Sequence, residues 1–372
     1  MLFYISGRLR PSLAAILLVL SVSAGPVCAA RGAAVPDLLD LPARAGARAH
    51  GALQLAVARA GERLVAVGVY GAVLLSDDAG KSWRQAAGVP VSVALTDVSF
   101  ASAERGWAVG HGGVVLHSAD AGEHWARQLD GRDAARIVLD AARARLAAGD
   151  PAAAREVRDA ERLVEEGPDK PLLGVSFVDA QRGYVVGAYG LALMTEDGGQ
   201  RWQSLVGRIP NPRGKHLYQI RAVGREILIA GEQGALFRSV DGGETFAEVP
   251  TPYAGTFFGA LALDGDTLLA YGLRGNVWRS GDGGQSWSQV DTGQAVAISS
   301  GLRLADGSLV LADESGRLLR STDAGRSFGA LSAHAAAGSA GLVQAADGAL
   351  ILSGARGLVR VEPAQLASEP AR

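Results

Sequence analysis

A short pattern, S/T-x-D-x-G-x-x-W/F, occurs six times in this chain of 372 residues and constrains its fold more than any other feature. The aspartates of the six copies are Asp78, Asp120, Asp197, Asp241, Asp282 and Asp323. Subtraction of their numbers gives steps of 42, 77, 44, 41 and 41 residues. A period near 40 residues, with strand-forming residues between the copies, is typical of the blades of a β-propeller. The one long step contains an insertion.

A second repeat, G-x-x-G, precedes each copy of the box pattern and raises the number of repeats to seven. Its copies are Gly68–Gly71, Gly110–Gly113, Gly187–Gly190, Gly231–Gly234, Gly272–Gly275, Asp313–Gly316 with aspartate in place of the first glycine, and Gly354–Gly357. Glycine reaches positive φ at little steric cost, which suits a tight turn between two strands. Each repeat is predicted to hold two strands, the glycine turn, a third strand, the box turn and a fourth strand. The sequence thus predicts an all-β fold, a seven-bladed β-propeller with an inserted α-helical hairpin between blades two and three.

The chemistry of the box favours a structural role for its residues. An aspartate or serine side chain can accept hydrogen bonds from backbone N–H groups nearby and so fix a tight turn. The closing Trp or Phe can bury a large apolar surface between blades. We therefore predict that the six box aspartates stabilise turns and bind no ligand.

The N-terminal residues have the pattern of a secretion signal. Arg8 and Arg10 precede the apolar run Leu13–Ser23, and small residues surround Cys28 before a cleavage position after Ala29. The predicted domains are a signal peptide (1–29), the propeller (30–362, with 131–171 as the helical insertion) and a C-terminal tail (363–372). A periplasmic or secreted protein is expected, with association to the membrane surface left open. A lipid on Cys28 and a retained membrane anchor remain alternatives.

Composition excludes several classes of site. Cys28 is the one cysteine, so neither a disulfide framework nor a cysteine metal site is available. The formal net charge of −2 gives no electrostatic reason to expect nucleic acid as a partner. His111, His117 and His124 fall in a turn, a strand and a box, and need not converge on a metal. We expect no cofactor and no metal.

The seventh repeat lacks a box and a fourth strand. Asp37–Leu41 is a short apolar segment close to the predicted N-terminus of the mature chain. We predict that this segment adds the missing strand and closes the ring, which would leave no open sheet edge. The alternative is a leader without a fixed place.

The insertion is predicted to form two helices, Arg132–Ala148 and Pro151–Glu166, because both segments are rich in Ala, Arg, Glu and Leu and lack internal glycine. Gly149 can end the first helix and Asp150 can cap the second. Narrow apolar stripes predict an antiparallel pair that touches mainly itself. The pair is either a docking arm for a partner or a structural decoration.

Strand alternation predicts which residues share a face. The G-x-x-G turns and the connections between blades lie on one face, and the boxes lie on the other. We predict partner binding on the first face, because arginine and tyrosine on a rigid scaffold are favoured interface anchors. The predicted residues are Tyr70, Tyr189, Arg274 and Arg356 in the turns, and Arg208, Arg213 and Lys215 in one long connection.

The boxes are similar to sialidase-type BNR repeats, and the seven-repeat layout resembles the photosystem II stability and assembly factor family, most closely its bacterial branch. The resemblance rests on the segments Ala66–Trp83, Gly167–Pro171, Val175–Phe177 and Gly183–Trp202, and it extends from about Asp37 to Glu362. It implies a non-enzymatic monomer that assists assembly or support of an envelope membrane-protein complex. The implied partner is an integral membrane protein or an envelope transport complex, without a small-molecule substrate.

The alternative function is a sialidase-like or carbohydrate-binding propeller. Hydrolysis of a glycosidic bond would need two suitably placed carboxylates. Glu232 and Glu314 are predicted on opposite turns of the ring, which gives no such pair. We therefore predict no catalytic residue.

Overall fold

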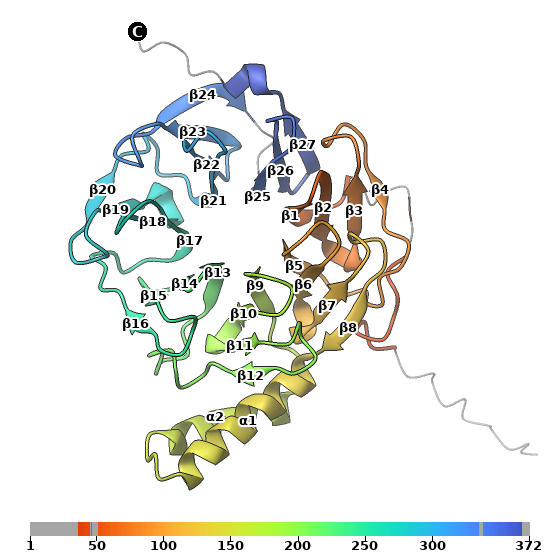
Figure 1. The fold of residues 1–372 in the computed structure, drawn as a ribbon, viewed down its shortest axis with the longest axis vertical. Helices are drawn as coiled ribbons and strands as arrows, with labels where there is room; N and C mark the ends of the chain where they lie inside the picture. The colour runs from red at the N-terminus through yellow and green to blue at the C-terminus, as the bar shows by residue number, and fades with distance from the viewer. Residues whose placement is uncertain (1–35, 45, 47–50, 335–337, 367–372) are drawn as a thin grey trace, which may run out of the picture. The chain divides into compact units, whose positions relative to one another are not determined.

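The computed structural model describes residues 36–44, 46, 51–334 and 338–366, and their main compact unit begins at Asp37. The predicted signal peptide lies outside the described residues. Seven antiparallel sheets stand around a common centre, so the predicted seven-bladed β-propeller is confirmed (Figure 1). Six sheets have four strands, and in the described residues the seventh has three.

The sheets follow one another along the chain, and the first strand of each lies nearest the centre (Figure 1). The first three sheets hold β1 (Gln54–Ala60), β2 (Arg63–Gly68), β3 (Val73–Ser76) and β4 (Arg84–Gln85); β5 (Leu95–Phe100), β6 (Gly106–Gly110), β7 (Val115–Ser118) and β8 (Ala126–Leu129); and β9 (Leu172–Phe177), β10 (Gly183–Gly187), β11 (Ala192–Thr195) and β12 (Gln203–Ser204). The fourth and fifth hold β13 (Leu217–Val223), β14 (Glu226–Gly231), β15 (Leu236–Ser239) and β16 (Ala247–Glu248); and β17 (Phe257–Ala262), β18 (Leu268–Gly272), β19 (Val277–Ser280) and β20 (Ser288–Val290). The sixth and seventh hold β21 (Ile298–Arg303), β22 (Leu309–Asp313), β23 (Arg317–Ser321) and β24 (Gly329–His334); and β25 (Ser339–Gln344), β26 (Leu350–Gly354) and β27 (Gly357–Val361).

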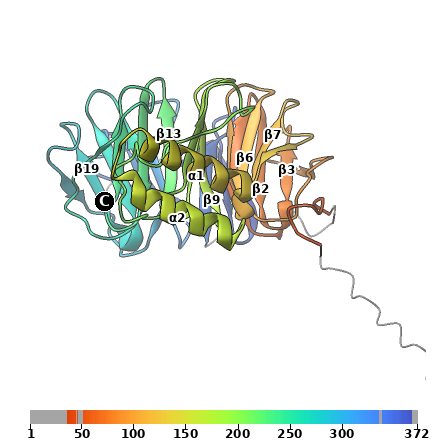
Figure 2. The ribbon, with the colours of Figure 1, turned by 90° about the horizontal axis from the view of Figure 1, so that it is seen from below.

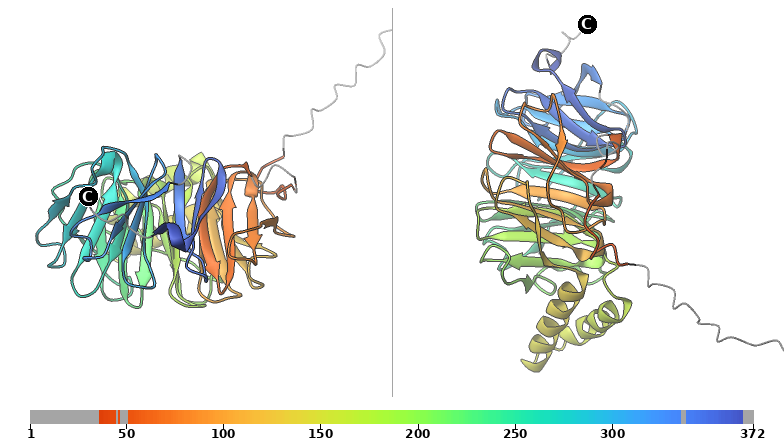
Figure 3. Two further views of the ribbon diagram at one scale, coloured as in Figure 1. Left: turned by 90° about the horizontal axis from the view of Figure 1, so that it is seen from above. Right: turned by 90° about the vertical axis from the view of Figure 1, so that its right-hand side faces the viewer.

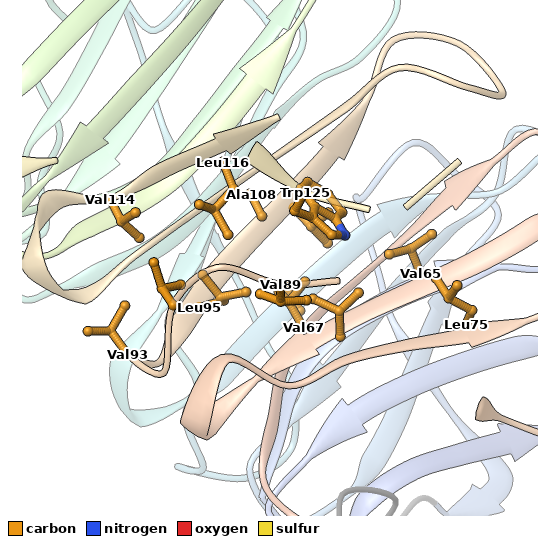
Figure 4. Close-up of a cluster of buried hydrophobic side chains, with 14 of the residues drawn as sticks. Val65, Val67, Leu75, Val89, Val93, Leu95, Ala108, Val114, Leu116 and Trp125 are labelled. Atoms are coloured by element: carbon orange, nitrogen blue, oxygen red, sulfur yellow. The ribbon is translucent and has the colours of Figure 1, made fainter. Parts of the chain in front are cut away.

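The core lies between neighbouring sheets. The second strand of each sheet is buried on both faces, and so it reads as an apolar run rather than as an alternating pattern. Figure 4 shows Val65, Val67 and Leu75 of the first sheet together with Leu116 and Trp125 of the second. Each sheet thus buries one face against the sheet before it and the other against the sheet after it.

The aspartate boxes repeat one hydrogen-bond pattern. In the first box the hydroxyl of Ser76 donates to Asp78 Oδ1 (2.8 Å), and Gly80 N donates to Ser76 Oγ (2.8 Å). Ser82 N donates to the same Asp78 oxygen (2.8 Å). The equivalent bonds recur in the other five boxes. The carboxylate therefore ties together both ends of a seven-residue segment, Ser76–Ser82 in the first box.

The aromatic residue that closes each box packs toward the preceding sheet. From the second box to the sixth, it shares a hydrophobic cluster with an aliphatic residue in or beside the fourth strand of that sheet. The pairs are Trp125 with Val89, Trp202 with Leu129, Phe246 with Leu205, Trp287 with Val249 and Phe328 with Val290. The fourth strand of one blade thus helps to bury the box of the next.

Acid is expected to unfold the propeller through these boxes. Hydrogen bonds from the Ser82 hydroxyl and backbone lower the pKa of Asp78 to about 2, and bonds from Arg201 and Ser286 do the same for Asp197 and Asp282. A carboxylate whose pKa is lower in the folded state stabilises the fold above its unfolded pKa near 4 and loses this effect as the pH falls toward 2. Near-UV circular dichroism should show cooperative unfolding between about pH 4 and pH 2.

The pKa of Asp97 is shifted in the opposite direction from the pKa values of the box aspartates, so Asp97 has the opposite effect on stability as the pH falls. Its burial raises its pKa to about 6, although Val175 N and Val98 N donate to it and a nearby Arg221 charge opposes the shift. Since protonation is easier in the folded state, this residue adds stability as the pH falls from about 6 to about 4. The pH of maximum stability is expected near 4 to 5. A protein equally stable at pH 2 and pH 5 would contradict the role of the boxes.

The insertion forms α1 (Gly131–Ala147) and α2 (Ala153–Glu166), between the second and third sheets along the chain. Asp130 and Asp133 form a capping box at the start of α1, and Gly149 has φ +91° after its end. Asp150 Oδ1 accepts from Ala152 N at the turn into α2 (3.0 Å). None of the helices in the part of the chain that the structure describes is long and apolar enough to cross a membrane.

The two helices touch mainly each other, as expected, and α1 in addition packs on the ring. Besides packing on α2, α1 buries a second stripe, with Ala134 and Val138 in one cluster with Leu129 and Trp202 of the adjacent sheets. Gly131 leaves the ring beside the G-x-x-G turn at Gly113, as the topology predicts, but the pair then runs across the side of the ring outside β12 (Figures 1 and 2). The right panel of Figure 3 shows both helices extending from that side.

The N-terminal segment does not complete the seventh sheet, so that prediction is wrong. Leu39 is buried in the cluster between the first and second sheets. Ser92 N donates to the carbonyl of Leu38 (2.8 Å), and Arg127 Nη1 donates to the carbonyl of Leu39 (2.8 Å). Leu39 fills the space above Gly112, where a side chain on that residue would collide with it. The ring closes instead by packing of β1 on β25 and β26, and the guanidinium of Arg360 donates to the carbonyl of Ala79.

Candidate functional site: the G-x-x-G face

The G-x-x-G turns hold large side chains in a backbone conformation that normally favours glycine. The third residue of four turns has positive φ without being glycine: Tyr70 (60°), Tyr189 (56°), Gln233 (54°) and Arg274 (58°). This left-handed conformation costs a non-glycine residue roughly 1 to 2 kcal/mol. The fold tolerates this cost even though both tyrosines are exposed, Tyr70 by 77% and Tyr189 by 63%.

The backbone around these turns is tightly fixed. A Cβ on the second glycine would lie 2.1 Å from the carbonyl oxygen of Val91 at Gly71, and 2.0 Å from that of Tyr253 at Gly234. Only glycine fits there, because the connection from the neighbouring strand passes directly against the turn. The exposed side chains are therefore presented from rigid positions.

Each first strand contains a β-bulge one residue from this face. In the fourth sheet Leu217 pairs with Gly231 and Gln219 with Ala230, so Tyr218 has no partner across the sheet. The unpaired residues of the seven sheets are Leu55, Thr96, Leu173, Tyr218, Phe258, Ser299 and Ala340. A bulge redirects its side chain, and bulges are common beside functional sites.

An open depression on this face lies where the third and fourth sheets meet. It is lined by Asp169, Lys170, Pro171, Leu173, Ala188, Tyr189, His216 and Tyr218. Two of these residues, Leu173 and Tyr218, are bulge residues. The depression therefore combines the G-x-x-G turn of the third sheet, the end of the helical insertion and the long connection into the fourth sheet.

Hydrogen bonds position the aromatic residues of the depression. Tyr189 N donates to His216 Nδ1 (2.8 Å), and His216 N donates to Glu232 Oε1 (2.9 Å). Because Nδ1 accepts, we assign the ring hydrogen to Nε2, which leaves a neutral imidazole with one remaining donor. The rings of Tyr189 and His216 meet edge to face, with centroids 4.8 Å apart. The aromatic row continues from His216 to Tyr218 (6.5 Å) and from Tyr218 to Phe258 (5.7 Å).

Lys170 supplies the cation of the depression. Its Nζ lies 5.0 Å from the centre of the Tyr189 ring, 2.6 Å from Asp169 Oδ1 and 2.8 Å from Glu166 Oε2. Burial opposes the charge, but the hydrogen bonds to the two carboxylates raise its pKa above the usual value. Burial also raises the pKa of Tyr218, so its hydroxyl stays protonated at neutral pH. The depression can thus donate hydrogen bonds beside apolar surface.

The structure places the seven predicted residues in three environments. Tyr70, Tyr189, Arg274, Arg356 and Arg213 are exposed on the G-x-x-G face, and the three arginines make no ion pair with any described residue. Lys215 is mostly buried there, with Nζ 3.4 Å from the carbonyl oxygen of Gln233 and 3.5 Å from Glu248. Arg208 lies apart from the others, because its guanidinium reaches Gly243 and Glu244 in the box of the fourth sheet.

The sequence patterns did not reveal the bulge residues or the part played by Lys170. Tyr218 and Phe258 stand in ordinary strand sequences, and no short motif marks them. The one available signal was their place, directly after the connection that enters the innermost strand. In the described part of the chain, no three or more His, Cys, Asp or Glu residues form a group that could hold a metal ion.

Comparison with known proteins gives a consistent result. Residues 156–328 match the family model described as photosynthesis system II assembly factor YCF48. A stretch of 77 residues is 35% identical to the photosystem II assembly lipoprotein Ycf48 of Synechococcus sp. (strain CC9902). That stretch is 21% of this chain and 23% of the relative, so the match spans about a quarter of the curated protein.

Solved structures show the same fold at low identity. A structure of YCF48 bound to D1 peptide has a TM-score of 0.59 at 17% identity, with 84% of this chain and 94% of that chain covered. YCF48 from Cyanidioschyzon merolae gives 0.60 at 14%, with 87% and 98% covered. The GH74 xyloglucanase from Xanthomonas campestris gives 0.58 at 13%, with 83% and 52% covered. The chain is thus a seven-bladed β-propeller, and residues 156–328, just under half of it, are similar to the photosynthesis system II assembly factor YCF48 family.

Proposed function

We propose that this protein is a non-enzymatic assembly factor that holds a segment of an integral membrane protein, or of an envelope transport complex, on its G-x-x-G face. The observation that carries the proposal is the set of exposed side chains kept at positive φ on rigid turns, Tyr70, Tyr189 and Arg274. Backbone strain that serves no packing purpose is characteristic of binding positions. Tyrosine and arginine are also the side chains that most often anchor interfaces.

The relatives support the same role. The curated relative is an assembly lipoprotein, and one structural neighbour was solved with a D1 peptide. For this chain we propose a similar role, in which it binds part of a membrane protein during assembly, at the membrane surface on the periplasmic side. The depression at Tyr189, with its donors beside apolar surface, suits an extended peptide segment.

Capture from native envelopes tests the proposal. The tagged mature protein would be crosslinked to its partners, in parallel with a variant that combines Tyr70→Ala, Tyr189→Ala and Arg274→Ala. All three side chains are exposed, so the fold should be kept, while loss of the anchors should reduce recovery of the membrane protein about tenfold or more. The readout is the amount of that protein recovered, measured by mass spectrometry.

A matched control uses the opposite face. Val223 and Val240 are 76% and 64% exposed, at the end of β13 and in the fourth box. Val223→Ala with Val240→Ala should leave recovery unchanged. Equal losses in both variants, or retention of the protein on a glycan column without capture of any protein, would contradict the proposal and favour a carbohydrate-binding propeller.

A further inference from the structure

We propose that the outer edge of β27 is a second docking position, where an extended segment of the partner pairs as the fourth strand of the seventh sheet. The segment carries an aliphatic side chain over Trp83 and an acidic residue beside Arg356. This inference rests on the proposed function, since it specifies how an extended partner segment is held. β27 lies at the outside of its sheet, next to the first sheet (Figure 1).

The outer edge of β27 is free to pair with a further strand. All five of its residues pair with β26 on one side, and no described strand pairs with the other side. Elsewhere the third-strand residue that pairs with the residue before the first glycine accepts a hydrogen bond from the residue just after the fourth strand: Ala86 N to Val73 O, Leu205 N to Ala192 O and Val249 N to Leu236 O, at 2.8–2.9 Å. Leu358 occupies this place in the seventh sheet, because it pairs with Ser353, the residue before Gly354. In an antiparallel pair, the backbone groups of such a residue both point to the same side.

The side chains beside the edge leave it open. Arg360 is held by Asp347, Glu362 and the carbonyl of Ala79. Arg320 has the same place in the sixth sheet, where it bonds to Asp306 and still pairs with β24. The residues after β27 form a short 3-10 helix, Pro363–Leu366, whose Leu366 packs in the cluster of the sixth and seventh sheets. The arginine therefore does not block a fourth strand.

The surroundings of Trp83 indicate which side chain the docked segment should carry. Its cluster contains Leu358 and Val343 of the seventh sheet, but no residue from a fourth strand among those the structure describes. Every other box aromatic has such an aliphatic partner, from Val89 to Val290. Trp125 and Trp202 are only 6% and 8% exposed, whereas Trp83 is half-buried, as are Phe246, Trp287 and Phe328. An aliphatic side chain on the added strand would complete the burial of Trp83.

The direction and charge of the occupant also follow. Fourth strands run from the box side to the G-x-x-G side, so the C-terminal end of the added segment reaches the turn at Gly354–Gly357. Arg356 is exposed in that turn and has no ion pair within the described chain, which suits a carboxylate.

A peptide copied from the chain's own fifth sheet is a suitable probe. Residues 284–293 (Gly-Gln-Ser-Trp-Ser-Gln-Val-Asp-Thr-Gly) contain β20, the aliphatic Val290 and the acidic Asp291 in the required order. A labelled peptide with blocked ends would be titrated with the mature protein, with fluorescence anisotropy as the readout. We expect saturable binding, and a peptide with Asp291→Asn should bind about threefold more weakly at low salt.

Variants of Leu358 decide whether the edge is responsible. Leu358→Pro removes the outward N–H without a loss of pairing to β26 and should weaken binding about tenfold or more. Leu358→Ile should bind like the unchanged protein, and Leu358→Lys, which protects the edge by charge, is a second test if the proline variant fails to fold. Loss of binding with both variants would support the proposal, and unchanged binding with Leu358→Pro would overturn it.

Two further outcomes would also overturn the proposal. A concentration-dependent dimer that Leu358→Pro dissociates would assign the edge to a second copy of the chain. Binding that appears only after deletion of residues 367–372 would assign it to the chain's own tail. The Tyr70, Tyr189 and Arg274 variant leaves β27 untouched, so it should still bind the probe peptide. The experiments therefore distinguish failure of the proposed binding on the G-x-x-G face from failure of the proposed pairing at β27.

Discussion

Trp107→Ala is expected to lower the free energy of unfolding by about 3–5 kcal/mol. Trp107 is fully buried, and its ring stacks on Phe177 of the next sheet with centroids 3.5 Å apart and planes within 6°. It also packs on His117 (4.8 Å), and its Nε1 donates to Gln128 Oε1 (3.2 Å). Alanine would leave a cavity between two rigid sheets that cannot collapse. Denaturant unfolding at neutral pH measures the loss.

Two other substitutions serve as controls for Trp107. Trp107→Phe keeps a ring against Phe177 and should cost clearly less than alanine. Tyr189→Ala removes an aromatic side chain that is 63% exposed and should change stability little. A loss below about 1 kcal/mol for Trp107→Ala would mean that the sheets adjust more easily than close packing implies.

Asp313→Gly alone is expected to cost about 3–5 kcal/mol, although glycine is the residue found at this place in the other repeats. Asp313 is fully buried and its Oδ2 accepts from Arg317 Nε (2.9 Å), while Ser315 N and Arg317 N donate to Oδ1. Without the carboxylate, the buried guanidinium of Arg317 would keep only its bond to the carbonyl of Thr292 (2.9 Å). An unpaired buried charge is strongly destabilising.

The second substitution in this turn should repair the first. Asp313→Gly combined with Arg317→Ala recreates the arrangement of Gly231 and Ala235 in the fourth sheet. We expect the double variant to regain most of the lost stability, which a double-mutant cycle by denaturant unfolding would quantify. Asp264→Ala, which breaks an exposed pair with Arg303, should have little effect because water screens that pair. Additive losses from the two substitutions would contradict a coupled ion pair.

The repeats made the architecture predictable from sequence. Two motifs in phase located seven blades, and the helices of the insertion begin and end within two residues of the predicted positions. The alanine-rich α1 was harder, because alanine suits a buried face and an exposed face equally, so the sequence did not show that Ala134 packs on the ring. Leu39 was misplaced because a five-residue apolar segment carries no information about which gap it fills.

The candidate site was predicted in part. Strand alternation placed Tyr70, Tyr189 and Arg274 on one face, where the structure has them. Arg208 lies elsewhere because the connection that follows β12 first passes the box of the next sheet. The pairing of Tyr189 with His216 depends on a bond between a backbone N–H and a ring nitrogen across 27 residues, and no local pattern reveals such a contact.

The seven β-bulges give the G-x-x-G face a ring of positions at which one side chain can be replaced by another. A bulged residue pairs with nothing across its sheet, so its side chain can change while the register on either side stays fixed. Thr96, Leu173, Tyr218, Phe258 and Ser299 already show how different these side chains can be on one backbone. A new binding specificity could therefore arise by substitution of these seven residues, without a change in the backbone of the propeller.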